Sequence, residues 1–437
     1  MYKRQAATRA VPGQYPTIAG AIAAAVNGDE VVVAPGTYVE SLNTAGKAIK
    51  LRSSGGAGVT RLSGLDLNAR IITCNTGETA ATIIEGFTFT QAIAPSGAAI
   101  FISNASPTVR DCVFYENFSE FFGGAVMSTG TASKPRLERC TFEFNSTYGT
   151  GGGLYLNTGA AVVASCLFKY NSGGGAGIGI AAGTHTVVNC KFLVNEGGFS
   201  HGGAIQIASG TPVIANGVFA GNHSYFNGGA IWAGNASSPR VHHCTIVDNS
   251  ATEGSGIHLA DTTTAQFFNC LLWGNQNNAF GGTVTPVISF SNVQGGVMPG
   301  TGNLSSLPSF VDANGPDNTA ASIEDNDYRV TLSSPGVDRG NSLTLPADLA
   351  DLDGDGNIRE TLPLDFDNHR RIVDSASAPN NGPDQPTDMG AYEARLPCRA
   401  DISPMNDYQL GNDEVNVDDL LAVINNWGRA SQQGVIT

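Results

Sequence analysis

One sequence pattern recurs seven times between residues 112 and 275. A Cys, or Gly217 in one copy, is followed two positions later by a large apolar residue, three positions after that by Asn, and then by a short loop and a Gly-rich segment. A period of 24 to 28 residues is typical of solenoids, in which each unit buries its apolar face against its neighbours. The repeated Asn residues are Asn117, Asn145, Asn171, Asn195, Asn222, Asn249 and Asn275.

Apolar and polar residues alternate within each copy. Ile205 and Ile207 flank Gln206, and Ile257 and Leu259 flank His258. Alternation with a period of two indicates short strands rather than helices. Three strands per copy, separated by Gly, Asn or Ser, predict an all-β fold, namely a right-handed parallel β-helix of about eleven or twelve coils stacked at the spacing of adjacent strands.

Stacking of the coils places equivalent residues above one another as ladders. We expect the Asn residues to form a ladder at one turn, with each amide bonding to its copies above and below. Stacked Cys residues have parallel side chains, which keeps their Cβ atoms too far apart for disulfides, so we expect free buried thiols. The inward apolar ladder consists of Phe114, Phe142, Phe168, Phe192, Phe219, Ile246 and Leu272.

The segments outside the repeats suggest four parts. An Ala-rich amphipathic helix at residues 17–26, before a strand at residues 30–34, is expected to cap the open end of the core. Residues 1–10 are expected to be a non-native or disordered leader, and residues 11–345 the β-helix. Residues 346–397 are expected to be an acidic loop-rich region, and residues 398–437 a small helical segment.

Charge is distributed unevenly along the chain. The net charge is −15, yet residues 1–310 carry equal numbers of acidic and basic side chains, so the excess acid lies after residue 310. Because the rod carries no basic stripe, we expect no binding to nucleic acid. No apolar run is long enough to cross a bilayer, so we expect no membrane span.

The acidic region contains a candidate calcium loop at residues 351–356. Asp351, Asp353 and Asp355 stand at alternate positions and Gly354 and Gly356 permit a tight turn, a pattern in which oxygen ligands wrap Ca²⁺. The twelfth position of an EF-hand loop would hold a bidentate Glu, but Leu362 stands there, so Asp365 or Asp367 would have to replace it. A solvated acidic turn is the alternative interpretation.

The repeats also resemble a known family. The stretches 114–117, 192–195 and 219–222, each followed by Gly-Gly-Ala-Val or Gly-Gly-Ala-Ile, are similar to the FxxN and GGAI repeats of polymorphic outer membrane proteins. Residues 15–38 resemble the opening coil of the pectin lyase-like superfamily. The resemblance implies a secreted or surface β-helix protein, often an adhesin. Residues 1–5 resemble a translated sequencing adapter, so we expect a truncated reading frame that has lost its signal peptide.

The C-terminal run 413–428 is similar to the second half of a dockerin repeat, a calcium loop that leads into a helix. The resemblance implies Asn412, Asn416 and Asp419 as calcium ligands and a cohesin-like partner. Dockerins usually carry two repeats, whereas only one is present here. A helical attachment segment is therefore the alternative interpretation.

The best binding signal is a column of outward residues on the strand after each Gly pair. Aromatic side chains in a row on a flat sheet suit stacking against sugar rings or a partner protein. The loop aromatics Phe121, Phe122, Tyr148, Phe199, Tyr225 and Phe226 would either extend this surface or cover it. The predicted carbohydrate-binding or partner-binding residues are Phe101, Tyr155, Gln206, Trp232 and His258.

The sequence assigns no catalytic residue. Arg110 one coil from Glu138, and Glu143 one coil from Lys169, are interpreted as surface ion pairs of little energy. We therefore expect a non-catalytic polysaccharide-binding or adhesin-like protein. The alternative is a polysaccharide lyase or glycoside hydrolase that acts on an acidic polysaccharide such as pectin, which would need clustered acids and a base in one groove.

Overall fold

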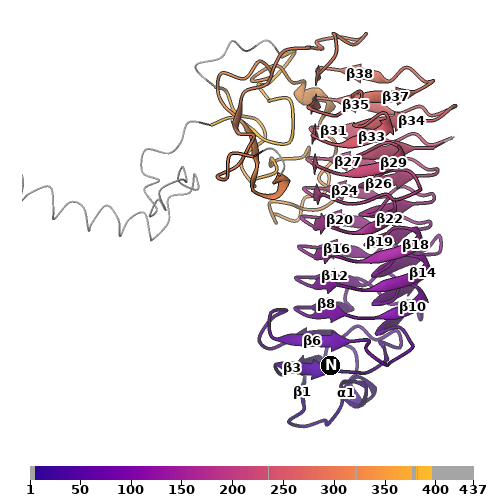
Figure 1. Ribbon diagram of the computed structural model, residues 1–437. Helices are drawn as coiled ribbons and strands as arrows, with labels where there is room; N and C mark the ends of the chain where they lie inside the picture. Colours follow the sequence, from indigo (N-terminus) through magenta and orange to yellow (C-terminus); the bar gives the residue numbers. More distant parts are fainter. Residues whose placement is uncertain (1–4, 235, 320–321, 376–379, 381, 396–437) are drawn as a thin grey trace, which may run out of the picture.

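The chain forms a rod of stacked coils (Figure 1). The computed structural model describes residues 5–234, 236–319, 322–375, 380 and 382–395. Successive coils add strands to three long parallel sheets of 12, 11 and 10 strands, which we call sheets A, B and C. The fold is therefore the parallel β-helix that the sequence predicted, with about the expected number of coils.

The strands of these sheets are two to four residues long. Sheet A contains β1 (Thr8–Val11), β2 (Glu30–Val33), β5 (Lys50–Ser53), β8 (Ile83–Glu85), β12 (Thr108–Arg110), β16 (Arg136–Glu138), β20 (Val162–Ala164), β24 (Thr186–Val188), β27 (Val213–Ala215), β31 (Arg240–His242), β35 (Gln266–Phe268) and β38 (Val287–Ser289). Sheet B contains β3 (Gly36–Tyr38), β6 (Thr60–Ser63), β9 (Thr88–Thr90), β13 (Val113–Tyr115), β17 (Thr141–Glu143), β21 (Leu167–Lys169), β25 (Lys191–Leu193), β28 (Val218–Ala220), β32 (Thr245–Val247), β36 (Leu271–Trp273) and β39 (Asn292–Val293). Sheet C contains β4 (Leu42–Asn43), β7 (Ile72–Cys74), β11 (Ile100–Ser103), β15 (Val126–Thr129), β19 (Leu154–Leu156), β23 (Ile178–Ile180), β26 (Ile205–Ile207), β30 (Ile231–Ala233), β34 (Ile257–Leu259) and β37 (Phe280–Gly282).

A fourth, shorter sheet runs along one side of the rod, between sheets B and C of the coils that contain it. The sequence did not predict it. We call it sheet D, and two further strands, β29 and β33, continue its line through single bridges at Glu196. Its strands are β10 (Ile93–Ser96), β14 (Phe118–Phe122), β18 (Ser146–Thr150) and β22 (Ser172–Gly174), followed by β29 (His223–Asn227) and β33 (Ser250–Glu253).

A short helix, α1 (Ile18–Ala24), caps the N-terminal end of the rod as predicted. Ile18, Ala21 and Ile22 are buried against the first coils. The Thr17 hydroxyl accepts a hydrogen bond from the Gly20 amide, which satisfies one of the free N–H groups of the first turn. None of the helices in the described residues is long and apolar enough to cross a membrane.

The limits of the β-helix differ from the expected 11–345 at both ends. β1 pairs in register with β2, with Thr8 opposite Glu30, so the rod includes residues 8–10 of the expected leader. At the other end, the last coil closes at β39 and a single bridge between Asn292 and Leu304. The β-helix ends before residue 345 because the sequence repeat stops. The described residues of 310–395 instead run back along the outside of the rod (Figure 1).

The core contains the predicted inward ladders. Phe89, Phe114, Phe142, Phe168, Phe192 and Phe219 are fully buried, and successive rings stack with centroids 4.6 to 5.0 Å apart. This parallel offset arrangement adds to the apolar burial of each ring. The seven described cysteines are free and buried, as expected.

The predicted Asn ladder is continuous from Asn117 to Asn275. In each step, the side-chain amide donates to the Oδ1 atom of the next Asn at 2.9 or 3.0 Å. The same Oδ1 atom also accepts the backbone N–H of the preceding Asn. Each Asn therefore pairs its buried polar atoms with neighbouring coils, which fixes their register.

We call the described residues of 310–395 the cover segment, because they cover the outer faces of sheets A and B. Its regular elements are β40 (Phe310–Asp312) and β41 (Asp327–Val330), which pair antiparallel, and the 3₁₀ turns η1 (Ile323–Asp325) and η2 (Ser342–Thr344). On sheet B, Tyr328 and Tyr392 pack in one apolar cluster with Val218, Val247 and Leu271. On sheet A, a second cluster joins Leu345, Ala350 and Leu362 to Ala164, Val188 and Ala215.

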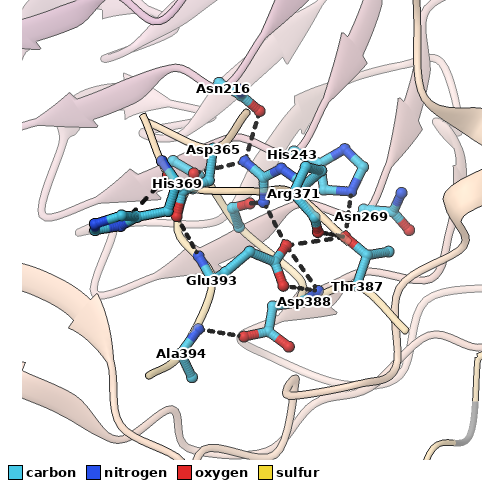
Figure 2. Close-up of polar contacts among 12 residues, drawn as sticks. Asn216, His243, Asn269, Asp365, His369, Arg371, Thr387, Asp388, Glu393 and Ala394 are labelled. Atoms are coloured by element: carbon cyan, nitrogen blue, oxygen red, sulfur yellow. Dashed lines mark hydrogen bonds and ion pairs between the residues drawn. The ribbon is translucent and has the colours of Figure 1, made fainter. Parts of the chain in front are cut away.

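A buried polar cluster fixes the cover segment to the corner between sheets A and B (Figure 2). Arg371 has no exposed surface, and its guanidinium donates to Glu393 at 2.9 Å and to the Asn216 Oδ1 atom of the rod at 2.6 Å. Asn189 and Asn216 donate in turn to backbone carbonyls of the cover segment. Asn189 and Asn216 both have positive φ, a conformation that Asn tolerates well. The same two residues therefore turn the coil and hold the cover segment.

Two histidines at this corner, His242 and His243, are buried. His243 lies against Thr387 of the cover segment, with 3.5 Å between Nε2 and Oγ1. His242 stacks on Phe268 and lines a cavity of about 330 Å³ between sheet A and residues 343–349. Burial, with a smaller contribution from Arg240, lowers the pKa of His242 to about 4.

Replacing one Asn of the ladder should destabilise the rod. In Asn171→Ala, the Phe142 carbonyl, the Asn145 amide groups and the Asn195 side chain lose buried partners. We expect the free energy of unfolding to fall by about 3 kcal/mol or more, measured by urea denaturation. The control Asn278→Ala removes an exposed Asn and should change little; equal losses in both variants would contradict the role of the ladder.

The buried His242 should make stability dependent on pH. Its pKa is lower in the folded chain, so the unfolded chain binds more protons between pH 4 and 6.5, and stability falls as the pH falls through this window. In His242→Phe this loss disappears, so the wild type should lose roughly 2 kcal/mol more than the variant between pH 7.5 and pH 5 in urea denaturation. Val213→Ala, in the same cavity, should keep the wild-type pH dependence. Identical pH profiles for wild type and His242→Phe would contradict this account.

Candidate functional site

The structure brings the predicted binding residues into one column on sheet C. Phe101, Tyr155, Gln206, Trp232 and His258 occupy equivalent positions of their strands and pair in register, with Met127 and Gly179 at the intervening coils. Each strand turns its two flanking apolar residues inward, so these side chains point outward. The column therefore exists as predicted, whereas its role in binding stays a prediction.

Most of this column is covered, which was one of the two expected outcomes. Phe122 stacks on Tyr155 with 4.6 Å between ring centroids, and His201 stacks on Trp232 at 4.9 Å. The Arg70 guanidinium lies 4.1 Å above the ring of Phe101. The column is therefore largely a packed layer, and the accessible aromatic rings lie outside it.

Six exposed aromatic rings follow sheet D and its continuation. They come from β14, β18, the segment between β25 and β26, and β29, which succeed one another along the rod. Tyr148 is 86% exposed and Phe199 is 83% exposed, and Phe199 stacks on Tyr225 at 4.9 Å. Figure 1 shows sheet D on the side of the rod away from the cover segment. We call these six side chains the aromatic surface: Phe121, Phe122, Tyr148, Phe199, Tyr225 and Phe226.

A group of polar atoms lies beneath the aromatic surface, around Trp232. Three buried atoms have no hydrogen-bond partner among the described residues: Nδ1 of His201, Oε1 of Gln206 and Nδ1 of His258. Gln206 and His258 are the register neighbours of Trp232, and His201 stacks on its ring. We call these four residues the polar niche. All three atoms are buried, and the Glu253 carboxylate lies 3.8 Å from the Nδ1 atom of His258.

The histidines of the polar niche favour the neutral state. Burial lowers the pKa of His201, and His258 lowers it further. Burial also lowers the pKa of His258, although the carboxylates of Glu253 and Asp261 oppose this shift. A neutral imidazole keeps one donor and one acceptor, so both rings can take part in hydrogen bonds of either direction.

The acidic loop brings together more carboxylates than the sequence predicted. Asp351, Asp353 and Asp355 each present a carboxylate oxygen within 4.8 Å of the others, and Asp348 and Glu360 meet Asp353 in the same way. Among the described residues, these are the two groups of three or more His, Cys, Asp or Glu side chains that lie close enough to hold a metal ion.

The expected substitutes for the missing EF-hand Glu lie elsewhere. Asp365 accepts hydrogen bonds from the backbone of Asp367, His369 and Glu393, and Leu362 is buried in an apolar cluster. The expectation that Asp365 completes the loop is therefore wrong, because its oxygens already stabilise the cover segment. The other predicted ligands, Asn412, Asn416 and Asp419, lie outside the described residues.

One of the two surface ion pairs expected from the sequence is present. Lys169 pairs with Glu143 at 3.0 Å, whereas Arg110 pairs with Glu85 at 2.6 Å instead of the expected Glu138, although Arg110 and Glu138 are register neighbours. These partly exposed pairs contribute little to stability.

Solved structures similar to this chain are polysaccharide lyases at low identity. Pectate lyase Pel9A shares 13% identity over 90% of this chain and 97% of its own, with a TM-score of 0.45. Alginate lyase AlyGC of family PL6 shares 16% identity over 70% of this chain and 54% of its own, with a TM-score of 0.33. A mutant of AlyGC gives 15% identity, with 75% and 58% covered and a TM-score of 0.35. The chain thus spans little more than half of the alginate lyase, and no activity is carried over from these proteins.

No curated protein matches the sequence. A family model described as right handed beta helix region matches residues 49–214 and 202–292, which is more than half of the chain. These limits contain the Cys, Phe and Asn ladders and most strands of sheets A, B and C. The chain is therefore a member of the right-handed β-helix family.

Proposed function

We propose that this protein is a non-catalytic polysaccharide-binding protein, secreted or displayed on a cell surface, that holds a neutral glycan along the aromatic surface. The observation that carries the proposal is the run of exposed aromatic rings on neighbouring coils. Attachment through residues 398–437 to a cohesin-like partner belongs to the same proposal and rests on the dockerin resemblance.

The aromatic surface has the chemistry that sugar rings require. One face of a sugar ring is apolar and stacks on aromatic rings, while its hydroxyl groups need hydrogen bonds. Tyr148 and Phe199 offer largely uncovered rings for such stacking. Because β18, which carries Tyr148, is bonded to β14 of the neighbouring coil, little conformational entropy is lost when this ring binds.

The charges around the aromatic surface favour a neutral glycan. Glu120 on β14, Glu196 between β22 and β29, and Glu253 on β33 all lie along this side of the rod. A polyanion such as pectate would meet like charges here, which weakens association. A neutral polysaccharide meets no such penalty.

Removing two stacked rings should weaken glycan binding. The double variant Phe199→Ala, Tyr225→Ala loses two exposed rings of one stacked pair, and each stacking contact is worth roughly 1 kcal/mol, so we expect affinity for a bound neutral polysaccharide to fall about tenfold or more. Affinity electrophoresis and calorimetry against a panel of neutral and acidic polysaccharides measure this. The control Val287→Ala removes an exposed apolar side chain on sheet A and should bind as the wild type does.

Two results would contradict the proposal. Release of reducing ends or of unsaturated uronates from any member of the panel would show catalysis, in line with the alternative of a lyase or hydrolase. Unchanged affinity in the double variant, with an unchanged melting temperature, would move the binding site away from the aromatic surface.

A further inference from the structure

A group of five carboxylates at residues 348–360 lies where the cover segment meets the rod. Asp353 belongs to both carboxylate groups, so the side chains of Asp348, Asp351, Asp355 and Glu360 converge around it. Five acidic side chains in this arrangement repel one another. A solvated turn would allow them to separate, but Asp348 is held in place by burial.

Asp348 and Glu360 both belong to this group, and each has a buried oxygen without a hydrogen-bond partner among the described residues. Asp348 is 1% exposed, and while its Oδ2 atom accepts the Leu352 amide at 2.7 Å, its Oδ1 atom has no hydrogen-bond partner among the described residues. The Oε1 atom of Glu360 is likewise buried without a partner. A buried carboxylate oxygen that faces other carboxylates is costly unless a cation or a proton neutralises it.

The same environment disfavours the charged forms of both groups. The pKa of Asp348 is raised by burial and by the carboxylates of Asp353 and Asp351. Burial and the neighbouring carboxylates also raise the pKa of Glu360. A bound cation would reverse these shifts, because it stabilises the ionised carboxylates.

The donor set suits calcium. Every group is a carboxylate, and hard oxygen ligands in numbers of six to eight are typical of Ca²⁺ sites, in which backbone carbonyls and water complete the shell. No His or Cys lies between residues 348 and 360, so the softer ligands preferred by zinc or copper are lacking in the loop. Gly354 and Gly356 have φ of 75° and 85°, and the Gly356 amide donates to Asp351 at 2.9 Å, so the loop is already wrapped.

The loop is also attached to the rod directly beside its buried ligand. Arg136 of β16 donates to the backbone carbonyls of Leu349 and Ala350, the two residues that follow Asp348, at 3.2 and 2.8 Å. Ala350 and Leu362, on either side of the loop, pack against sheet A. A cation that binds only the ordered loop therefore stabilises the docked position of the cover segment.

We propose that residues 348–360 form a Ca²⁺ site with Asp348, Asp351, Asp353, Asp355 and Glu360 as ligands, and that Ca²⁺ at this site holds the cover segment on the rod. This site is separate from the aromatic surface and does not depend on glycan binding.

Calcium titration of the full chain after treatment with chelator tests the site. The wild type and the double variant Asp348→Asn, Glu360→Gln both keep residues 398–437, so any calcium bound there contributes equally to both. We expect calorimetry to show one Ca²⁺ per chain fewer in the variant. Asp353→Asn, which changes an exposed side chain, should show the same loss and excludes a packing defect as the cause. Asp325→Asn, an acid outside the loop, should bind as the wild type does.

Limited proteolysis with mass spectrometry tests the coupling. In the wild type, Ca²⁺ should slow cleavage within residues 310–395 about tenfold relative to chelator, and this protection should vanish in the double variant and in Asp353→Asn. Equal stoichiometry in wild type and both variants would overturn the site. Loss of one Ca²⁺ without any change in protection would overturn the coupling, and equal protection by Mg²⁺ would overturn the assignment to calcium.

Discussion

The in-register stacking of coils is the constraint on which the rest of the structure depends, and the Asn ladder is its clearest physical form. From Asn117 to Asn275, successive amides bond to one another inside the rod. A shift of one residue in any coil would leave several buried polar groups unpaired, so the ladder selects a single register. Once the register is fixed, every outward side chain stands above its equivalent, and the columns on the surface follow from the repeat.

These columns divide the rod into two sides with different surroundings. On sheet A, the outward residues change from charged ones such as Arg110 and Glu138 on the lower coils to Ala164, Val188 and Ala215 further along. This apolar stretch is where the cover segment packs. The side that carries sheet D keeps exposed aromatic rings instead. The same backbone geometry thus supplies one face for internal packing and another that is open to a ligand.

The period of the repeat was sufficient to predict the fold, the three main sheets and the inward ladders, because these depend only on which residues stack. The cover segment was not predicted, although a signal exists: Val218, Phe219 and Ala220 of β28 are all buried, so both faces of this strand are apolar. The alternating pattern of the repeats had predicted strands with one apolar face only, which leaves no face for a covering segment.

The remaining misses depend on contacts between distant parts of the chain. Alternate spacing identified Asp351, Asp353 and Asp355, whereas Asp348 and Glu360 join them through the path of the loop rather than through spacing. In the same way, the sequence left open whether Phe122 extends or covers the column, because its stacking on Tyr155 joins two coils. A pattern of residues along one coil carries no information on such contacts.

The cover segment buries negative charge against the rod, and its two polar clusters differ in how this charge is compensated. The excess negative charge of the chain lies after residue 310, yet part of it is buried against a rod that is neutral. At the corner, Arg371 faces the Glu393 carboxylate, and backbone amides satisfy Asp388, so the chain supplies its own compensation. At residues 348–360, no basic side chain of the described part of the chain bonds to the converging carboxylates, and Arg136 is directed to backbone carbonyls. The Ca²⁺ that we propose for this loop would supply the compensation there, and it would make the docking of the cover segment sensitive to calcium.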